Sequence, residues 1–389
     1  MWSADDHRHM ARALALGRLG LYTAHPNPRV GCVLVKDGAV VGEGWHRRAG
    51  EPHAEVLALR AAGRRARGAS CYVTLEPCCH QGRTPPCTES LVGAGIARVI
   101  LAMTDPNPAV QGRGCQALAE AGIAIAVGLG EGEATRLNRG FVKRMRFGLP
   151  GVTAKTAMSL DGRVALRSGV SRWITSQAAR ADVQRLRAQS SAILTGIGTV
   201  LADDPLLSVR DPVLAGAGAA PLRVVLDTRL RMPPSARMLR EAGSTLVLCG
   251  EAGPERRVAL AEAGARVIEV PLRGGRPDLT QVMWTLAGLE VNEVLLEAGP
   301  DLTGAMLAAG LVDELVAYVA PRLLGGDAIP MAALGGYSRL EDALQLEITD
   351  VRAIGSDWRI TARPVSGGSP LSPPDVRGLM FTARCSPES

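Results

Sequence analysis

The first 148 residues alternate between two hydrophobic periods. Apolar positions spaced as on an α-helix predict helices at residues 9–22, 52–62, 86–95 and 117–121. Short apolar runs predict strands at residues 30–35, 69–76, 97–105 and 123–127, and a turn at residues 36–38 leads from the first of these into a further strand. This alternation of helix and strand predicts an α/β fold.

Glycine and proline interrupt the pattern at residues 148–151, and a second alternation begins there. Seven apolar runs predict strands at residues 152–159, 191–196, 223–227, 244–250, 265–270, 293–299 and 314–321. We therefore expect two α/β domains, over residues 1–148 and 149–363, which suits a chain of 389 residues. The small-residue stretch 211–221 predicts a loop, and the Pro-, Gly- and Ser-rich residues 364–389 predict a poorly ordered tail.

The composition, 47% hydrophobic and 21% charged, is typical of a globular protein, and an aromatic content of only 3% predicts cores of small aliphatic side chains. No apolar run reaches the length of a membrane span, and the N-terminus has no apolar stretch like that of a signal peptide. We expect a cytoplasmic protein without membrane association. The net charge of +6 could suit nucleic acid, but the arginines are scattered and form no single basic run, so phosphorylated small molecules fit equally well. Because aromatic residues for stacking are also scarce, we expect a phosphorylated small molecule and no nucleic acid as the partner.

Cysteine and histidine are distributed unevenly. Four of the eight cysteines, Cys71, Cys78, Cys79 and Cys87, lie within seventeen positions, and all six histidines lie in the first eighty residues. Without an export signal, clustered cysteines indicate thiols or metal ligands and not disulfides. Metal or proton chemistry that uses imidazole therefore belongs to the N-terminal part.

The strongest chemical signal is a set of three zinc-ligand types at the ends of predicted elements. His53 begins a predicted helix, and Cys78 and Cys87 each follow a proline. A catalytic zinc site keeps three nitrogen or sulfur ligands and leaves the fourth position for water. The positive end of a helix also helps to hold a cysteine as thiolate. We therefore expect one zinc ion per chain, held by these three residues.

Glu55 gives that site a chemical purpose. Zinc lowers the pKa of its water to roughly 7, and a glutamate two residues beyond a ligand can take the proton without binding the metal. The arrangement matches the H-x-E and P-C-x-x-C signature of zinc deaminases, except that eight residues separate Cys78 from Cys87. We expect hydrolytic deamination with Glu55 as the catalytic residue, and residues 79–86 as a loop over the pocket.

Three other interpretations remain open at this point. A structural zinc in a non-catalytic scaffold would use four protein ligands and would have no use for Glu55. Cys79 competes with Cys78 as a ligand, but neighbouring side chains diverge and only Cys78 follows a proline. A deaminase acting on RNA or free nucleobases, followed by a binding domain, would need aromatic residues beside basic ones. Cys32, Cys71 and Cys115 are expected to be core thiols.

Several long strings of this sequence resemble one family, the bifunctional riboflavin biosynthesis proteins, in which a pyrimidine deaminase is fused to a reductase. The strings are HPNPRVGCVLV, GEGWHRRAGEPHAEVLAL, TLEPCCHQGRTPPC, TDPNPAVQGRG, KTAMSLDGRVAL, SRWITS, GIGTVLADDPLLSVR and EAGPDLTGAML. The resemblance covers most of the chain, from about residue 10 to residue 363. The resemblance implies a cytidine-deaminase-like three-layer domain followed by a dihydrofolate-reductase-like domain. The lack of a G-x-G-x-x-G motif after residue 148 agrees with the second.

The resemblance also implies two consecutive reactions. The first removes the 2-amino group of 2,5-diamino-6-(5-phosphoribosylamino)pyrimidin-4-one, with Asn27, His46 and His80 near the substrate. The second reduces the ribosyl group to ribityl with NADPH. We further expect a homo-oligomer, a dimer or a tetramer.

The resemblance implies residues for the second reaction as well. NADPH would contact Ala157, Trp173, Thr199, Asp203, Thr228, Gly299, Pro300, Asp301, Leu302, Thr303, Gly304 and Ala305. The sugar phosphate would meet Ser171, Arg187, Leu207, Arg210 and Glu297. Lys155 and Asp203 are candidates for polar roles near the ribose carbon. From the residues themselves, Arg187 and Arg210 suit phosphate because their guanidinium groups are planar and permanently charged. The glycine-rich turn before the helix at residue 300 could offer backbone N–H groups to a phosphate.

Overall fold

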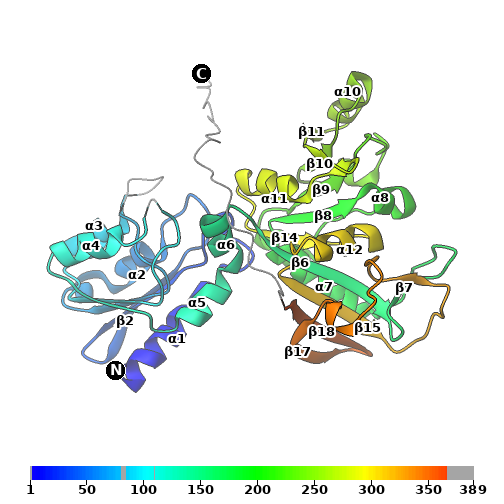
Figure 1. The fold of residues 1–389 in the computed structure, drawn as a ribbon. Coiled ribbons are helices and arrows are strands. Elements are labelled where there is room, and N and C mark those ends of the chain that lie inside the picture. The colour runs from blue at the N-terminus through cyan, green and yellow to red at the C-terminus, as the bar shows by residue number, and fades with distance from the viewer. Residues whose placement is uncertain (1, 80–84, 109, 366–389) are drawn as a thin grey trace.

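The structure, a computed structural model, describes residues 2–79, 85–108 and 110–365. His80, most of the predicted loop between Cys78 and Cys87 and nearly all of the predicted tail lie outside these residues. Two separate sheets, of five and nine strands, organise the chain (Figure 1). Both combine with helices, so the predicted α/β class is confirmed.

The smaller sheet has the strand order β2-β1-β3-β4-β5. Its strands are β1 (Gly31–Lys36), β2 (Ala39–Trp45), β3 (Ser70–Val73), β4 (Arg98–Leu101) and β5 (Ala124–Val127). The accompanying helices are α1 (Ala4–Arg18), α2 (Ala54–Ala62), α3 (Cys87–Gly93), α4 (Arg113–Glu120), α5 (Glu131–Leu137) and α6 (Arg139–Phe147), with a 3-10 turn η1 (Gly63–Ala66). Strands β1 to β3 pair antiparallel and β3 to β5 pair parallel.

The larger sheet has the strand order β11-β10-β9-β8-β14-β6-β15-β18-β17. Its strands are β6 (Gly151–Ser159), β8 (Ala192–Gly196), β9 (Leu222–Leu226), β10 (Thr245–Cys249), β11 (Ala265–Glu269), β14 (Glu293–Leu296), β15 (Glu314–Ala320), β17 (Leu346–Ile354) and β18 (Asp357–Pro364). Seven strands are parallel, and β17 and β18 add an antiparallel hairpin at one edge.

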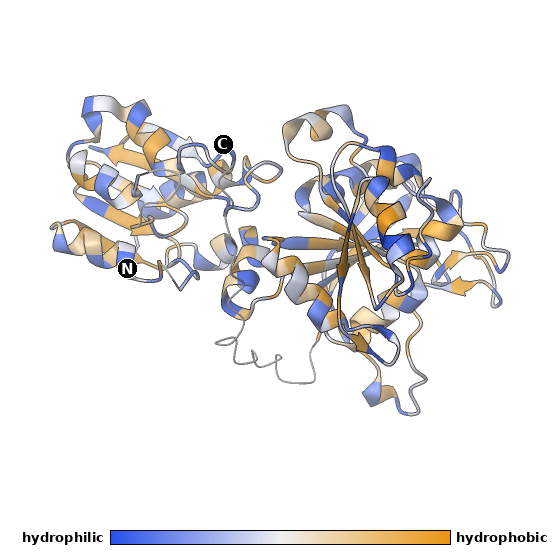
Figure 2. Ribbon diagram, turned by 90° about the horizontal axis from the view of Figure 1, so that it is seen from above, coloured by the Kyte–Doolittle hydropathy of each residue, from blue (hydrophilic) through white to orange (hydrophobic). Residues whose placement is uncertain are grey.

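Helices and short ribbons complete the second half. The helices are α7 (Gln177–Gln189), α8 (Ile197–Asp203), α9 (Pro212–Ala217), α10 (Pro254–Glu262), α11 (Leu279–Gly288) and α12 (Pro300–Ala308), with 3-10 turns η2 (Arg237–Arg240) and η3 (Leu340–Asp342). Two small ribbons pair β12 (Leu272–Arg273) with β13 (Arg276–Pro277), and β16 (Ile329–Pro330) with β7 (Arg163–Ala165). The inner strands of both large sheets are predominantly hydrophobic and buried (Figure 2), whereas the edge strand β17 is largely exposed.

Most predicted strands are confirmed, including all seven after residue 151, but two predictions were wrong. Residues 211–221 are not simply a loop, because Asp211 caps α9 by accepting the backbone N–H of Val213 and Leu214, and Pro212 suits the first helical position. The first helix begins at Ala4 and ends at Arg18, because Ser3 and Asp6 form a capping box.

Two glycines of β2 allow α2 to approach the sheet closely. A Cβ atom at Gly42 would collide with the carbonyl oxygen of Ala58, and one at Gly44 with that of Ala54 and, at 2.6 Å, with the backbone nitrogen of Ala58. Gly31 makes the same kind of approach to α1, at Ala13, on the opposite face. Helices thus cover both faces of the smaller sheet, which gives the predicted three layers (Figure 1).

Gly44→Ala will force α2 away from β2. We expect a loss of about 1–3 kcal/mol in the free energy of unfolding, as for other overpacked sites, and weaker zinc binding because His53 precedes the displaced helix. Denaturant titration and zinc competition with a chelator measure the two effects. In the control Gly132→Ala on α5, the new Cβ would meet only Arg136 Nη1, at 3.6 Å. Equal effects of the two variants would contradict this account.

Candidate active sites

Three side chains from separate segments converge beside the smaller sheet. His53, Cys78 and Cys87 place one ligand atom each within 4.8 Å of one another. His53 Nδ1 lies 3.2 Å from the Sγ of Cys87 and 3.5 Å from that of Cys78. His53 is the N-cap of α2 and Cys87 is the first residue of α3, so two helix N-termini meet here. The sequence predicted a helix over residues 52–62 with His53 in its first turn, whereas α2 begins at Ala54 and His53 is its N-cap.

The donor set suits zinc. One imidazole nitrogen and two sulfurs are ligands that zinc prefers, and three of them leave a fourth position open. The pKa of the Cys78 thiol is lowered to about 4 by its contact with the Cys87 thiol and, after the opposing effect of burial, by His53 and the Cys87 backbone N–H, which donates at 3.4 Å. A thiolate is the form in which cysteine binds a metal. Cys79 is not part of this group among the described residues.

Glu55 lies next to this cluster and interacts with all three of its members. Its side chain is buried, with 3% of the residue exposed, in the first turn of α2. Burial raises its pKa to about 7. A carboxyl group of that pKa can both accept and release a proton near neutral pH, which is the property of a general acid–base catalyst.

Asn27 and His46 lie beside the candidate ligand cluster of His53, Cys78 and Cys87. The Asn27 Nδ2 lies 3.0 Å from His46 Nε2, as a donor to the ring nitrogen, and the His46 ring meets the His53 ring edge-on with centroids 5.3 Å apart. Burial, followed by the nearby His53, lowers the pKa of His46. The structure therefore brings two of the three predicted substrate residues next to the ligand cluster. The third, His80, lies outside the described residues.

A second group of predicted residues gathers at one edge of the larger sheet. Because parallel strands end at the same edge, the ends of β6, β8, β9 and β14 come together there. Ala157 lies near the end of β6, Thr199 follows β8, Thr228 follows β9, and Gly299 begins the run to Ala305 after β14. Gly299 is the N-cap of α12, and Pro300, Asp301, Leu302, Thr303, Gly304 and Ala305 form its first turns. The helix N-terminus can receive a phosphate.

A buried charge cluster lies beside this edge. Arg187 Nε and Nη2 donate to the two Glu297 oxygens at 2.6 and 3.0 Å, and Lys155 Nζ lies 3.3 Å from Glu297 Oε2. Against the effect of burial, Arg187 and then Lys155 hold the pKa of Glu297 well below its usual range. Arg187 also donates to the carbonyl of Ser208 at 2.9 Å. Three of its five N–H groups are thus committed to the protein.

Arg210 is the more accessible arginine of this region. Burial, and then the positive charges of Arg187, Arg237 and Arg180, lower its pKa. A cluster of arginines that destabilise one another's charge would be relieved by a phosphate. Arg180 and Arg237 were not predicted, and no local signal distinguishes them from other surface arginines. Leu207, which is buried, adopts φ +48° in the turn that leads to Arg210.

The segment after β7 approaches the same region. Arg172, between the predicted Ser171 and Trp173, donates to the carbonyl of Asp203 at 2.8 Å. Trp173 is 58% exposed, and the guanidinium carbon of Arg180 lies 4.4 Å from its ring centroid. The predicted cofactor residues Trp173 and Asp203 are therefore linked through Arg172.

Comparisons with known proteins cover both halves. Residues 3–103 match the family model of the cytidine and deoxycytidylate deaminase zinc-binding region, and residues 150–360 match that of the RibD C-terminal domain. The riboflavin biosynthesis protein RibD of Escherichia coli (strain K12) is 50% identical over 362 residues, which are 91% of this chain and 98% of that protein. This chain belongs to the RibD family.

Other RibD proteins agree in sequence and in fold. That of Haemophilus influenzae is 44% identical over 93% of this chain and 98% of its own length. The structure of Acinetobacter baumannii RibD (form 1), also 44% identical, covers 93% of this chain and 99% of its own with a TM-score of 0.88. A Thermotoga maritima structure, described as a diaminohydroxyphosphoribosylaminopyrimidine deaminase/5-amino-6-(5-phosphoribosylamino)uracil reductase, is 30% identical over 93% of this chain and 99% of its own, with a TM-score of 0.81.

Membership confirms the predicted enzyme classes. The chain is a bifunctional enzyme of riboflavin biosynthesis, with a zinc-dependent deaminase half and an NADPH-dependent reductase half of dihydrofolate-reductase-like fold. Its substrates are small molecules. No helix in the described part of the chain combines the length and apolar character needed to cross a bilayer.

Proposed function

We propose that this chain deaminates 2,5-diamino-6-(5-phosphoribosylamino)pyrimidin-4-one and then reduces the ribosyl side chain of the product to ribityl. The observation that supports the deamination step is the cluster of His53, Cys78 and Cys87 with the buried Glu55 next to it. The substrate is named from the Thermotoga maritima relative.

In the deaminase half, the protein's own groups bind the pyrimidine and move protons. Zinc held by the three ligands would supply a water with a pKa of roughly 7 as the nucleophile. Glu55 accepts a proton from this nucleophile and passes protons to the ring nitrogen and the departing amino group, so that ammonia leaves and a carbonyl remains. Asn27 and His46 orient the ring through their polar atoms, and His80 is proposed as a third contact.

In the reductase half, the sheet edge binds the cofactor and arginines bind the phosphate. NADPH would supply a hydride to the C=N carbon of the ring-opened sugar. We assign the N-terminus of α12 and the ends of β6, β8 and β9 to the cofactor. Arg210 binds the phosphate together with the free N–H groups of Arg187, while Ser171 and Leu207 line that site. Glu297 orients Lys155 toward the reacting group.

Three further features belong to this proposal. The deaminase domain comprises residues 1–148 and the reductase domain residues 149–363.

The enzyme works in the cytoplasm, because all seven described cysteines are free and the zinc ligands must stay reduced. It forms a homo-dimer or homo-tetramer, which the exposed apolar side chains of the edge hairpin support, with Ile348 60% and Trp358 53% exposed.

Glu55→Gln will abolish deamination and leave the zinc site intact. Loss of the proton carrier should lower the rate of ammonia release about 10²- to 10⁴-fold, while metal analysis still finds one zinc per chain. Glu89→Gln, an exposed glutamate on α3, is the matched control and should release ammonia at the normal rate. Unchanged ammonia release by Glu55→Gln with zinc bound would refute the catalytic assignment.

Arg210→Gln will weaken binding of the phosphorylated substrate to the reductase half. Losing a charge-assisted hydrogen bond should raise the KM for the deaminated substrate about 10- to 100-fold and leave the KM for NADPH nearly unchanged. Steady-state measurements of nicotinamide absorbance give both constants. Arg266→Gln, at an exposed position of the edge strand β11, is the control. A larger effect on NADPH than on substrate would place Arg210 in the cofactor site instead.

A further inference from the structure

The loop that carries Asn27 is held from outside the deaminase sheet. On one side of Asn27, the Nδ1 of His25 lies 2.9 Å from the hydroxyl of Ser191, which directly precedes β8. The side-chain Nδ2 of Asn292, which precedes β14, donates to the backbone carbonyl of Pro26 at 2.8 Å. Both partners belong to the reductase half of the chain.

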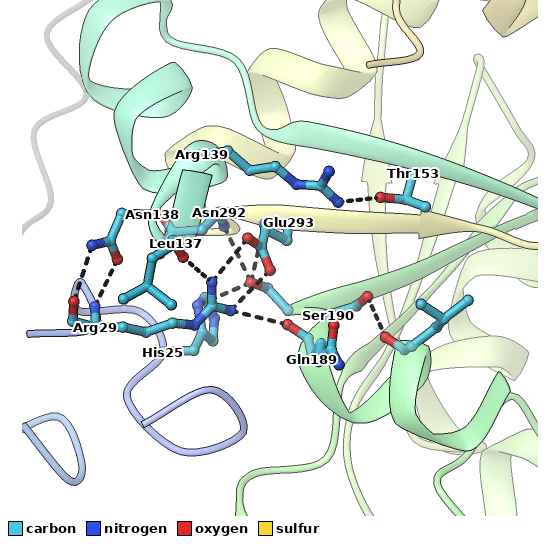
Figure 3. Close-up of polar contacts among 12 residues, drawn as sticks. His25, Arg29, Leu137, Asn138, Arg139, Thr153, Gln189, Ser190, Asn292 and Glu293 are labelled. Carbon is cyan, nitrogen blue, oxygen red and sulfur yellow. Dashed lines mark hydrogen bonds and ion pairs between the residues drawn. The ribbon is translucent and has the colours of Figure 1, made fainter. Parts of the chain in front are cut away.

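On the other side of Asn27, Arg29 makes a denser set of contacts (Figure 3). Its Nη1 and Nη2 lie 3.1 and 2.9 Å from the two Glu293 oxygens, and Nη2 also donates to the carbonyl of Gln189 at 3.3 Å. Nη1 donates to the carbonyl of Leu137, and Asn138 pairs with the backbone N–H and carbonyl of Arg29 at 2.7 and 3.0 Å.

The ion pair between the two halves is largely shielded from water. The Arg29 and Glu293 side chains are 12% and 16% exposed. Against the effect of burial, Arg29 lowers the pKa of Glu293. Removing one charge of such a pair leaves the other buried and unpaired, which is far costlier than losing a surface pair.

The reductase side of this contact is rigid. Ser191 Oγ accepts the backbone N–H of Asn292 at 3.3 Å and of Glu293 at 3.2 Å, and the Ser191 N–H donates to the Glu293 carbonyl at 2.8 Å. The Asn292 carbonyl accepts the N–H of Gly151 at 2.8 Å, and Arg144 Nε donates to the Asn292 side chain. These groups begin neighbouring strands in the middle of the nine-stranded sheet, so they cannot move independently.

Asn27 lies between these two anchored positions, and its amide faces His46. His46 in turn packs against the ring of His53. The position of the Asn27 amide relative to the metal ligands is therefore set jointly by the deaminase sheet and by the start of β14.

We propose that Glu293, supported by Asn292 and Ser191, is a positioning residue for the deaminase site, through which the reductase half fixes the Asn27 loop in its substrate-binding geometry. This inference rests on the proposed role of Asn27 in binding the pyrimidine. It means that the fused reductase is part of the deaminase scaffold as well as the second enzyme.

Kinetics of Glu293→Gln in the full-length enzyme test the proposal. We expect the KM for deamination to rise about tenfold, as for loss of a hydrogen bond to a charged group, with a smaller change in kcat because Glu55 and the zinc ligands are untouched. Zinc content, and kcat and KM for reduction of separately supplied deaminated substrate, should stay at the unmodified values. Glu293→Asp, which keeps the charge, should recover at least part of the loss.

The matched control is Asp313→Asn. Asp313 accepts Lys143 Nζ of α6 at 2.7 and 2.8 Å in another ion pair, and among the described residues no hydrogen bond links it to residues 25–29. The Asp313→Asn variant should leave the KM for deamination unchanged.

Asn27→Ala separates failure of this inference from failure of the proposed function. If Asn27→Ala raises the KM for deamination and Glu293→Gln does not, the positioning role of Glu293 is refuted and the substrate role of Asn27 stands. If Asn27→Ala has no effect on deamination, the substrate role fails and the inference fails with it. If Glu293→Gln also lowers zinc content or reductase kcat, Glu293 stabilises the whole fold and the positioning role is refuted.

Discussion

The close packing of α2 on β2 determines where the deaminase chemistry can occur. At Gly42 and Gly44 the backbone of β2 is in direct contact with the backbone of α2, at Ala58 and Ala54. This close packing fixes the position of the start of α2 relative to the sheet. His53 and Glu55 lie at that helix end and Cys87 begins α3, while Cys78 lies in the irregular segment after β3. The geometry of the ligand atoms therefore depends on how precisely the elements that carry them pack together.

The second site follows from a different constraint. Parallel strands place their carboxyl ends along one edge, and the loops after β6, β8, β9 and β14 carry the residues that we propose to bind NADPH and the sugar phosphate. The central strand β14 serves both halves of the chain, because Glu293 at its start pairs with Arg29 and Glu297 just beyond its end pairs with Arg187. If Glu293 positions the Asn27 loop as we propose, this one strand supports both sites.

The features that the sequence predicted correctly are those that residues close together in the chain determine. The histidine at a helix start and the two proline–cysteine pairs were enough to indicate the metal cluster, because each signal marks the end of an element. The edge strand β17 escaped prediction because it is exposed along most of its length and a bulge between Ile348 and Asp350 interrupts its alternation; its hairpin partner β18 was missed with it. The helix α9 was missed because its small residues outweighed the Asp211 cap. The Arg29–Glu293 pair spans 264 positions, and no local pattern announces a contact of that kind.

The mass of the product formed from the diaminopyrimidine substrate tests the central claim most directly. Without NADPH, the unmodified enzyme should convert the substrate to a product one mass unit heavier, because an amino group is replaced by a carbonyl oxygen. With NADPH, a further gain of two units should follow from the addition of hydride and a proton. A two-unit gain without the first step, or no mass change in either condition, would contradict the account.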